Sequence, residues 1–230
     1  MTSYAGLIPA KPVMVSYILY PRAKQNRKRD IKMAIATDLI KKLREKTNAP
    51  MMDCKKALEE SNGDLETAVD VLRKRGQIVA LKKAGRCAKE GVTGSYIHSN
   101  SKLGVLLEVN CETDFVARNE DFKQFVKDVA MHIAATAPSY ISREEVPSHI
   151  LEKEKSVLKE TVKNKPENIL EKIVQGKLEK FYSEVCLLDQ PFVKDDKKTI
   201  KDYLNELIGK IGENIVIRRY VRFQVGEDIK

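Results

Sequence analysis

The 230-residue sequence contains no tryptophan, and aromatic residues make up only 6% of it. Surfaces that stack on sugars or on nucleic-acid bases usually need such rings, so this composition disfavours both kinds of binding. No apolar stretch approaches the roughly 18–20 residues of a membrane-spanning helix, so we expect no membrane association. What is present, 42% hydrophobic and 33% charged residues, is typical of a globular chain with one large or two modest domains.

Residue patterns of common catalytic and metal sites are also missing. The widely spaced cysteines form no C-x-x-C pair and share no motif with the histidines; they are Cys54, Cys87, Cys111 and Cys186, and His98, His132 and His149. Cys111 precedes acids rather than a histidine, which disfavours a reactive thiolate. "GKIGEN" (209–214) lacks the spacing of a phosphate-binding loop. Glu108, Glu112 and Asp114 have no further ligand at fixed spacing. We therefore expect no enzyme, no cofactor and no metal site.

The net charge of +9 suggests nucleic acid, but most of it lies at one end of the chain. Residues 1–32 hold seven basic residues and one acid, which leaves only +3 for the rest. With so low a net charge, the rest of the chain is not expected to form a strongly basic surface, so we expect no direct contact with nucleic acid. We interpret residues 1–32 as a disordered basic extension of a cytoplasmic protein with reduced thiols; the alternative is an organellar transit segment.

Residues 33–77 predict a small helical module. Apolar residues at helical spacing indicate three short helices between residues 37 and 76, separated by the breaks "NAP" and "NGD". We expect Met52 to face the core of this module, Asp64 to cap the third helix and Gly76 to end it. A core of about 40 residues is marginal by itself, so the module should lean on a partner or on the following domain.

Residues 78–230 predict an α+β domain. After a linking helix over residues 77–90, two strands are indicated over 92–100 and 102–111, and a third over 213–225. No helix-sized crossover gives the third strand a parallel partner, so an antiparallel sheet with helices on one face is the natural packing. We therefore expect a core with a three-stranded antiparallel sheet and several helices.

Local signals bound the helices of this domain. The expected elements are, in chain order, a helix over residues 119–137 capped by Asn119 and stopped by Pro138, two helices within 142–182 of which the second opens at Pro166 and Glu167, a loop over 187–197 and a helix over 199–210. Ser142 and Glu145 are expected to form the capping box of the first helix in 142–182.

The stretch "NCETDFVARNEDF" (110–122) places an acid beside a phenylalanine twice. Phe122 begins an amphipathic helix and has a core to enter, whereas Phe115 does not. In one interpretation Thr113 caps a helix, Asp114 stabilises its first turn by about 0.3–1 kcal/mol, and Phe115 enters the core. In the other, the end of a strand presents Asp114 and Phe115 outward to a partner. The residue pattern leaves both open.

From about residue 33 to 227 the chain resembles the bacterial elongation factor Ts family. Five blocks in family order carry the resemblance: "IKKLREKTNAPMMDCKKALEESNGDLETAVDVLRKRG", "VNCETDFVARN", "MHIAATAP", "QPFVKDD" and "KIGENIVIRRYVRF". The first block resembles the family's N-terminal module, which is similar to ubiquitin-associated (UBA) domains. The chain lacks one half of a duplicated core and so resembles the short forms of thermophiles, cyanobacteria and plastids, which can pair as homodimers.

The resemblance implies guanine-nucleotide exchange on elongation factor Tu, without covalent chemistry. It implies that Phe115 is a wedge between helices of that GTPase, and that Asp114 perturbs the groups that order Mg²⁺. The positions that match partner contacts of the family are Thr113, Asp114, Phe115, Val116, Lys55, His132, Val193, Ile211 and Gly212. Two alternatives remain: an RNA-associated accessory protein of translation that uses the basic tail and the small helical bundle as a pseudo helix-turn-helix, and a binder of ubiquitin-like ligands through residues 37–76.

Overall fold

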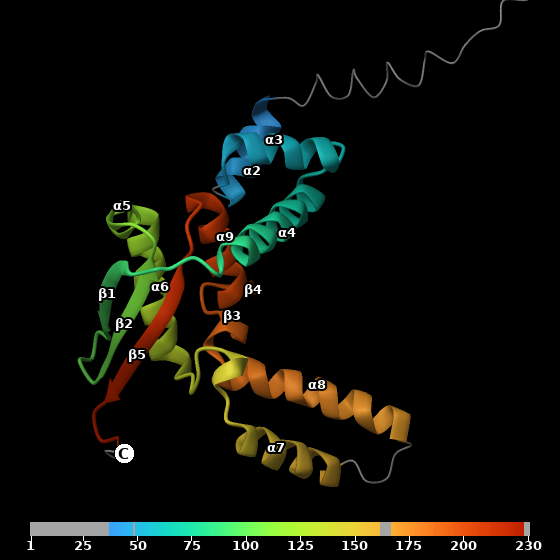
Figure 1. Cartoon of the computed structure of the whole chain (residues 1–230), viewed down its shortest axis with the longest axis vertical. Coiled ribbons are helices and arrows are strands. Elements are labelled where there is room, and N and C mark those ends of the chain that lie inside the picture. Colours follow the sequence, from blue (N-terminus) through green and yellow to red (C-terminus); the bar gives the residue numbers. More distant parts are fainter. Residues whose placement is uncertain (1–36, 48, 162–166, 228–230) are drawn as a thin grey trace, which may run out of the picture.

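The computed structural model describes residues 37–47, 49–161 and 167–227 (Figure 1). Its elements in chain order are α2 (Thr37–Thr47), α3 (Met51–Glu60), α4 (Leu65–Lys83), β1 (Glu90–Ile97), β2 (Leu103–Cys111), α5 (Asp114–Ala117), α6 (Glu120–Thr136), the 3-10 turn η1 (Arg143–Glu145), α7 (Ser148–Thr161), α8 (Glu167–Val185), the 3-10 turn η2 (Leu187–Asp189), β3 (Pro191–Phe192), β4 (Asp195–Thr199), α9 (Ile200–Ile211) and β5 (Val216–Gln224). The predicted basic extension lies outside the described residues.

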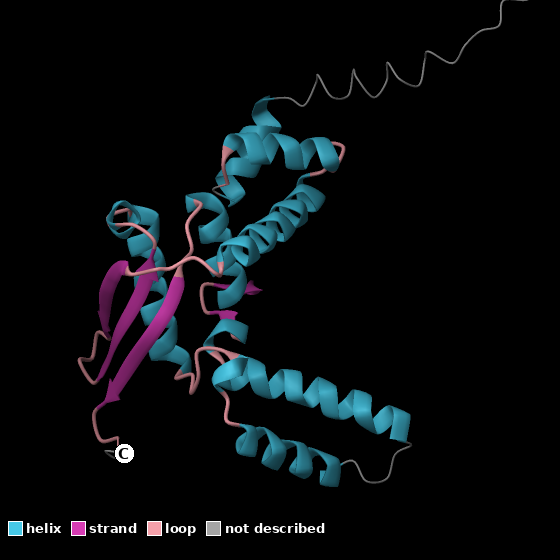
Figure 2. Cartoon of the chain, viewed as in Figure 1, coloured by secondary structure: helices cyan, strands magenta, loops and turns pink. Residues whose placement is uncertain are grey.

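The main sheet has the strand order β1-β2-β5, and both pairings are antiparallel. Side chains alternate across the central strand β2, so that Val105, Leu107 and Val109 are buried while Leu106 is half exposed. Helix α6 packs on β1 and β2 and covers the buried face (Figure 2). The prediction of an α+β fold with a three-stranded antiparallel sheet and several helices is confirmed.

Helix α6 supplies the other half of this core. The side chain of Asn119 accepts a hydrogen bond from the backbone N–H of Asp121 and caps the helix, as predicted. Phe122, Phe125 and Ile133 recur at helical spacing and are fully buried. The sheet and α6 therefore share one packed core, and the turn that connects β2 to α6 lies at its end.

The three N-terminal helices have a separate small core, formed by Ile40, Leu43, Cys54, Ala57, Leu58 and Ala68. The Asp64 side chain caps α4 by accepting from the N–H of Thr67, as predicted. The expectation for Met52 is wrong, because its side chain is 62% exposed. Met52 lies on the solvent face of α3, since Cys54 and Leu58 already turn the opposite face to the core.

The expectation that Gly76 ends the third helix is also wrong, because α4 runs on through Gly76 to Lys83. Gly76 lies where α4 crosses α9. A Cβ atom at this position would lie 3.1 Å from the carbonyl oxygen of Asn205, and one at Gly209 would lie 3.3 Å from the Cα of Gly76. The two glycines therefore let the helix backbones approach closely.

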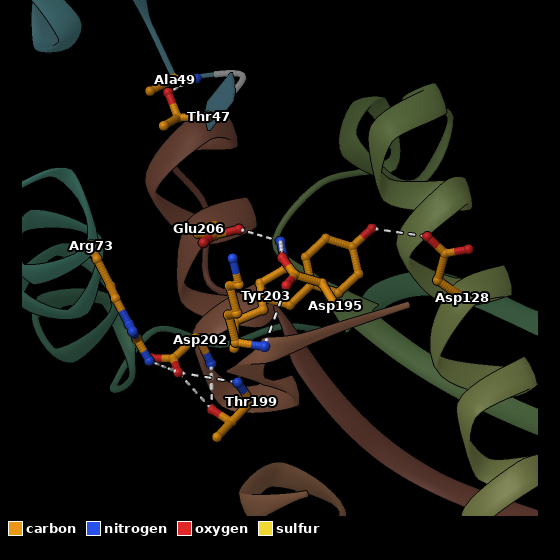
Figure 3. Close-up of polar contacts among 11 residues, drawn as sticks. Thr47, Ala49, Arg73, Asp128, Asp195, Thr199, Asp202, Tyr203 and Glu206 are labelled. Carbon is orange, nitrogen blue, oxygen red and sulfur yellow. Dashed lines mark hydrogen bonds and ion pairs between the residues drawn. The ribbon is translucent and has the colours of Figure 1, made fainter. Parts of the chain in front are cut away.

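A charged contact supports the same crossing. Figure 3 shows Arg73 of α4 reaching the carboxylate of Asp202, which also accepts from the hydroxyl of Thr199. The backbone N–H of Thr199 also donates to this carboxylate, and the Thr199 hydroxyl accepts from the N–H of Asp202; these two bonds form a capping box at the start of α9. Burial works to raise the pKa of Asp202, but the hydrogen bonds from Arg73 and Thr199 outweigh it and lower the pKa. This carboxylate thus joins the N-terminal helices to the core.

Two local expectations in the second half of the chain are wrong. Ser142 makes no side-chain cap; Glu145 accepts instead from the N–H of Ile141, the segment forms η1, and α7 starts only at Ser148. Pro147 explains the delay, because the residue before a proline avoids helical geometry. The expected loop at 187–197 contains η2 and the small hairpin of β3 and β4. No helix in the described ranges is both long and apolar enough to cross a membrane.

Candidate interaction site

The short helix α5 lies between β2 and α6 and carries Asp114 and Phe115, which together with Thr113 form the acid-and-ring turn. Phe115 is 79% exposed, whereas its neighbours Val116 and Ala117 are each only 8% exposed and belong to the main core. Helical geometry separates adjacent side chains by about 100°, so burial of the next two residues turns Phe115 outward. The interpretation in which Phe115 enters the core is therefore wrong.

Asp114 is half-buried beside this ring and forms an i,i+4 ion pair with Arg118 at 2.8 Å. Both partners lie near solvent, and exposed pairs of this kind contribute only about 0–1 kcal/mol. The carboxylate can therefore exchange Arg118 for another partner at low cost.

The neighbouring acids do not converge on a metal. Glu108 pairs with Arg219 at 2.6 Å, and Glu112 accepts from the N–H of Asn214 at 2.6 Å. In the part of the chain that the structure describes, no group of three or more ligand side chains could hold a metal ion. Burial raises the pKa of the Cys111 thiol to about 11, with the charge of Glu213 a smaller cause, which keeps this thiol protonated at neutral pH.

The loop after α9 meets the base of α5. Residue Asn110 near the end of β2 pairs with Val216 at the start of β5, so the segments that extend these two strands lie side by side. Thr113 precedes α5 but makes no side-chain cap to it; its N–H and hydroxyl both donate to the carboxylate of Glu213, at 3.0 and 2.7 Å. Gly212, at a φ of 83°, ends α9 in the left-handed conformation that glycine favours. Ile211 and Gly212 thus lie beside the acid-and-ring turn.

His132 lies in a different part of the core and is fully buried. Its Nε2–H donates to Gln190 at 2.9 Å, and its Nδ1 faces the N–H of Val193 at 3.4 Å. Burial lowers the pKa of His132, and the hydrogen bond to Gln190 opposes this shift. The side chain of Val193 is 46% exposed at the tip of the β3–β4 hairpin. His132 therefore supports an exposed residue and has no surface of its own.

The nine predicted contact positions thus fall into three groups by exposure. Phe115, Lys55 and Val193 are exposed, and Asp114, Thr113, Ile211 and Gly212 are half-buried. Val116 and His132 are buried in the core of the same chain. Lys55 lies on α3 near the exposed Met51 and Met52, on the N-terminal helices rather than beside α5 (Figure 1).

An exposed aromatic ring beside a half-buried acid, carried on a packed core, is typical of proteins that bind another macromolecule. A sequence model of the family described as "Elongation factor TS" matches residues 25–227. Elongation factor Ts of Thermodesulfovibrio yellowstonii is 59% identical over 196 residues, 85% of this chain and 98% of the relative. That of Acetivibrio thermocellus is 59% identical over 198 residues, 85% of this chain and 92% of the relative. Thermotoga maritima elongation factor Ts is 55% identical over 195 residues, 85% of this chain and 98% of the relative. The chain therefore belongs to the elongation factor Ts family.

Proposed function

We propose that this protein is the guanine-nucleotide exchange factor of elongation factor Tu in translation elongation. It binds the GDP-bound GTPase, disturbs the magnesium and phosphate site, and lets GDP leave. The observation that carries this proposal is the exposure of Phe115, at 79%, within the stretch "VNCETDFVARN", which resembles the exchange motif of the family. Binding is stabilised when a partner covers an aromatic ring that is otherwise exposed to water.

The physical basis of exchange is thermodynamic linkage. GDP in such a GTPase is held by backbone amides of the phosphate loop and by Mg²⁺. A protein that binds the nucleotide-free conformation more tightly than the GDP-bound one must lower the affinity of the GTPase for GDP by the same factor. Moving a two-state equilibrium from 1:99 to 99:1 takes about 5.5 kcal/mol of differential binding. This requirement exceeds what one contact supplies, so several surfaces must contribute.

Phe115 and Asp114 form the central contact in this proposal. The ring of Phe115 inserts between helices of the GTPase domain, and burying it is worth about 1.5–3 kcal/mol. The carboxylate of Asp114 enters beside this ring and competes for the groups that order Mg²⁺. Its exposed pairing with Arg118 makes this exchange of partners inexpensive.

The remaining positions divide into contacts and supports. Lys55 on α3 contacts the nucleotide-binding domain of the partner, and Ile211 with Gly212 contacts it next to α5. Val193 reaches an outer domain of the partner. Three residues support these contact surfaces from within the chain. Val116 anchors α5 in the core, and Thr113 fixes the start of α5 through its bonds to Glu213. His132 holds the backbone at Val193.

Residues 33–77 act as a UBA-like module, residues 78–230 as the exchange and dimerisation core, and residues 1–32 as a basic extension that exchange does not require. The small separate core of α2, α3 and the first part of α4 supports this division. The Arg73–Asp202 contact and the glycine crossing of α4 with α9 support a fixed attachment of the module to the core.

Two copies of the chain pair through the open face of the sheet. Opposite α6, the outward residues Ile97, Leu106, Val221 and Phe223 are 64%, 50%, 47% and 69% exposed. Gly104 pairs with Ile97 on one side and Phe223 on the other, and these three residues with Leu106 border a hollow of about 410 Å³. Contiguous apolar patches of this kind mark protein interfaces. A second copy supplies the same face and buries it by two-fold symmetry, in keeping with the single half-core of the short forms.

Release of a fluorescent GDP analogue from elongation factor Tu tests the proposed function. The full chain is expected to accelerate release at catalytic concentrations. Linkage adds a sharper expectation. A factor that weakens the binding of Mg²⁺ to the GTPase must itself bind the GTPase less tightly when the Mg²⁺ concentration is raised. A release rate that does not respond to this protein would overturn the proposal.

A further inference from the structure

Two glutamates cross-connect the acid-and-ring turn with the end of α9. Glu112, before the turn, accepts from the backbone N–H of Asn214 at 2.6 Å. Glu213, after α9, accepts from the N–H of Thr113 at 3.0 Å and from its hydroxyl at 2.7 Å. Each loop thus caps the backbone of the other. Hydrogen bonds to ionised carboxylates are roughly twice as strong as neutral ones.

A third segment closes this junction from the end of α4. The side-chain amide of Asn214 donates to the carbonyl of Arg86 at 2.7 Å, and the ammonium of Lys83 donates to the carbonyl of Gly212. Asn214 is only 4% exposed, so its polar groups depend on these partners. The hydrogen bond from the N–H of Asn214, with the nearby Arg86 as a smaller cause, lowers the pKa of Glu112. The junction is therefore a built structure rather than a pair of crossing loops.

Helix α5 needs such a support. It has only 4 residues and no side-chain cap from Thr113. One isolated turn has almost no helical stability of its own, so tertiary contacts must set its direction. Val116 and Ala117 fix the inner side of the turn in the core. The bonds from Thr113 to Glu213 fix its start, and they tie that start to Gly212, one residue away from Glu213.

We propose that Glu213 is a positioning residue for nucleotide exchange, which holds the turn with Phe115 and the loop with Ile211 and Gly212 as one preformed surface. The proposal rests on the exchange function proposed above. Glu213 acts through geometry, because a preformed surface loses less conformational freedom when it binds. Glu112 makes the reciprocal contact in the same junction.

A double-mutant cycle separates positioning from general stability and from charge. Glu213→Ala removes both bonds to Thr113 and is expected to lower the exchange efficiency about tenfold in the wild-type background. Combined with Phe115→Ala it should cost a markedly smaller factor, because the ring no longer has to be placed and only the rest of the surface depends on Glu213. If Glu213→Ala costs the same factor in both backgrounds, the positioning role is refuted.

The conservative variant distinguishes geometry from charge. In Glu213→Gln the amide oxygen can still accept the N–H of Thr113, and its NH₂ group can donate to the Thr113 hydroxyl. Exchange should therefore stay within about threefold of the wild type. A loss as large as that of Glu213→Ala would assign the effect to the charge and overturn the proposal.

Two controls keep the test decisive. Glu145→Ala removes a carboxylate bond to a backbone N–H at η1, the bond to Ile141 at 2.9 Å, and should leave exchange unchanged. If Glu213→Ala folds poorly, Thr113→Val removes only the hydroxyl bond at nearly constant shape and should lower exchange about threefold; an unchanged rate would contradict the proposal. A wild-type chain that releases no GDP would instead refute the proposed function itself.

Discussion

Phe115 and Phe122 carry the same side chain in opposite surroundings, since they are 79% and 0% exposed. Replacing Phe122 by alanine opens a cavity and should lower the free energy of unfolding by about 3–5 kcal/mol. Phe115→Ala removes no packed side chain, so the free energy of unfolding should change by less than about 0.5 kcal/mol. Urea unfolding of the two variants checks this. A large decrease in the free energy of unfolding for Phe115→Ala would mean that the ring packs within the free chain and is not available to a partner.

His132 predicts a pH dependence of stability. Burial lowers its pKa in the folded chain, so the unfolded chain binds the proton more readily, at a pKa of about 6.5. The stability that His132 contributes is fully present above about pH 6.5 and is lost as the pH falls below that value.

The matched variant is His132→Gln, which keeps a donor for Gln190 but does not titrate. Unfolding free energies measured between pH 7.5 and 5 should fall more steeply for the wild type than for this variant. Parallel curves would contradict the assignment of a neutral, buried His132.

Single residues also mark where sequence reasoning stops. The motif at 110–122 indicated that Asp114 and Phe115 were unusual, but one turn of helix gives too few side chains to define an inner face. Only the burial of Val116 and Ala117 decides the direction of Phe115. Glu213 had no sequence signal at all, because its partner Thr113 lies far away in the chain.

At the scale of elements, the glycine in α4 tests the packing against α9. Gly76→Gln forces a side chain against the backbone of Asn205 and should cost about 1–3 kcal/mol of unfolding free energy. Gly176→Gln in α8 is the matched control, because no atom lies within 4 Å of the position where its Cβ would be. This second change should stabilise the protein by about 0.5–1 kcal/mol through helix propensity. Equal effects in thermal unfolding would show that α4 and α9 do not cross at Gly76.

Two similar sequence patterns form different structures, and the difference is physical. Thr199 with Asp202 forms a real capping box, whereas Ser142 with Glu145 does not. The second pattern is followed by Pro147, which delays the helix. Gly76 reads as a helix end in sequence because a glycine is equally suited to a close helix crossing, and only the position of α9 distinguishes the two roles.

At the scale of the whole molecule, the three strand patterns and the absence of a helix-sized crossover were sufficient to predict a three-stranded antiparallel sheet with helices on one face. The packing of the N-terminal helices on α9 depends on long-range contacts such as Arg73 with Asp202, which no local pattern reveals. The open face of the sheet likewise becomes visible only when the strand order is known.

The proposed pairing of two chains predicts a measurable change of mass. Leu106→Lys places a charge at the centre of the open sheet face, where burial against a second copy would be costly. Sedimentation should show a dimer for the wild type and a monomer for the variant. Thr93→Lys, on the same face of the sheet but further from the apolar patch, is the control and should remain dimeric. A wild-type chain that stays monomeric at micromolar concentration would contradict the pairing.

The central claim is that one exposed ring, presented by a rigid turn, opens the nucleotide site of another protein. The most direct measurement is the release of fluorescent GDP from elongation factor Tu with the wild type and with Phe115→Ala, at equal concentrations and at the same Mg²⁺. The wild type should accelerate release, and Phe115→Ala should lose at least about tenfold of that acceleration, as expected for a central interface residue. Equal acceleration by both proteins would contradict the account.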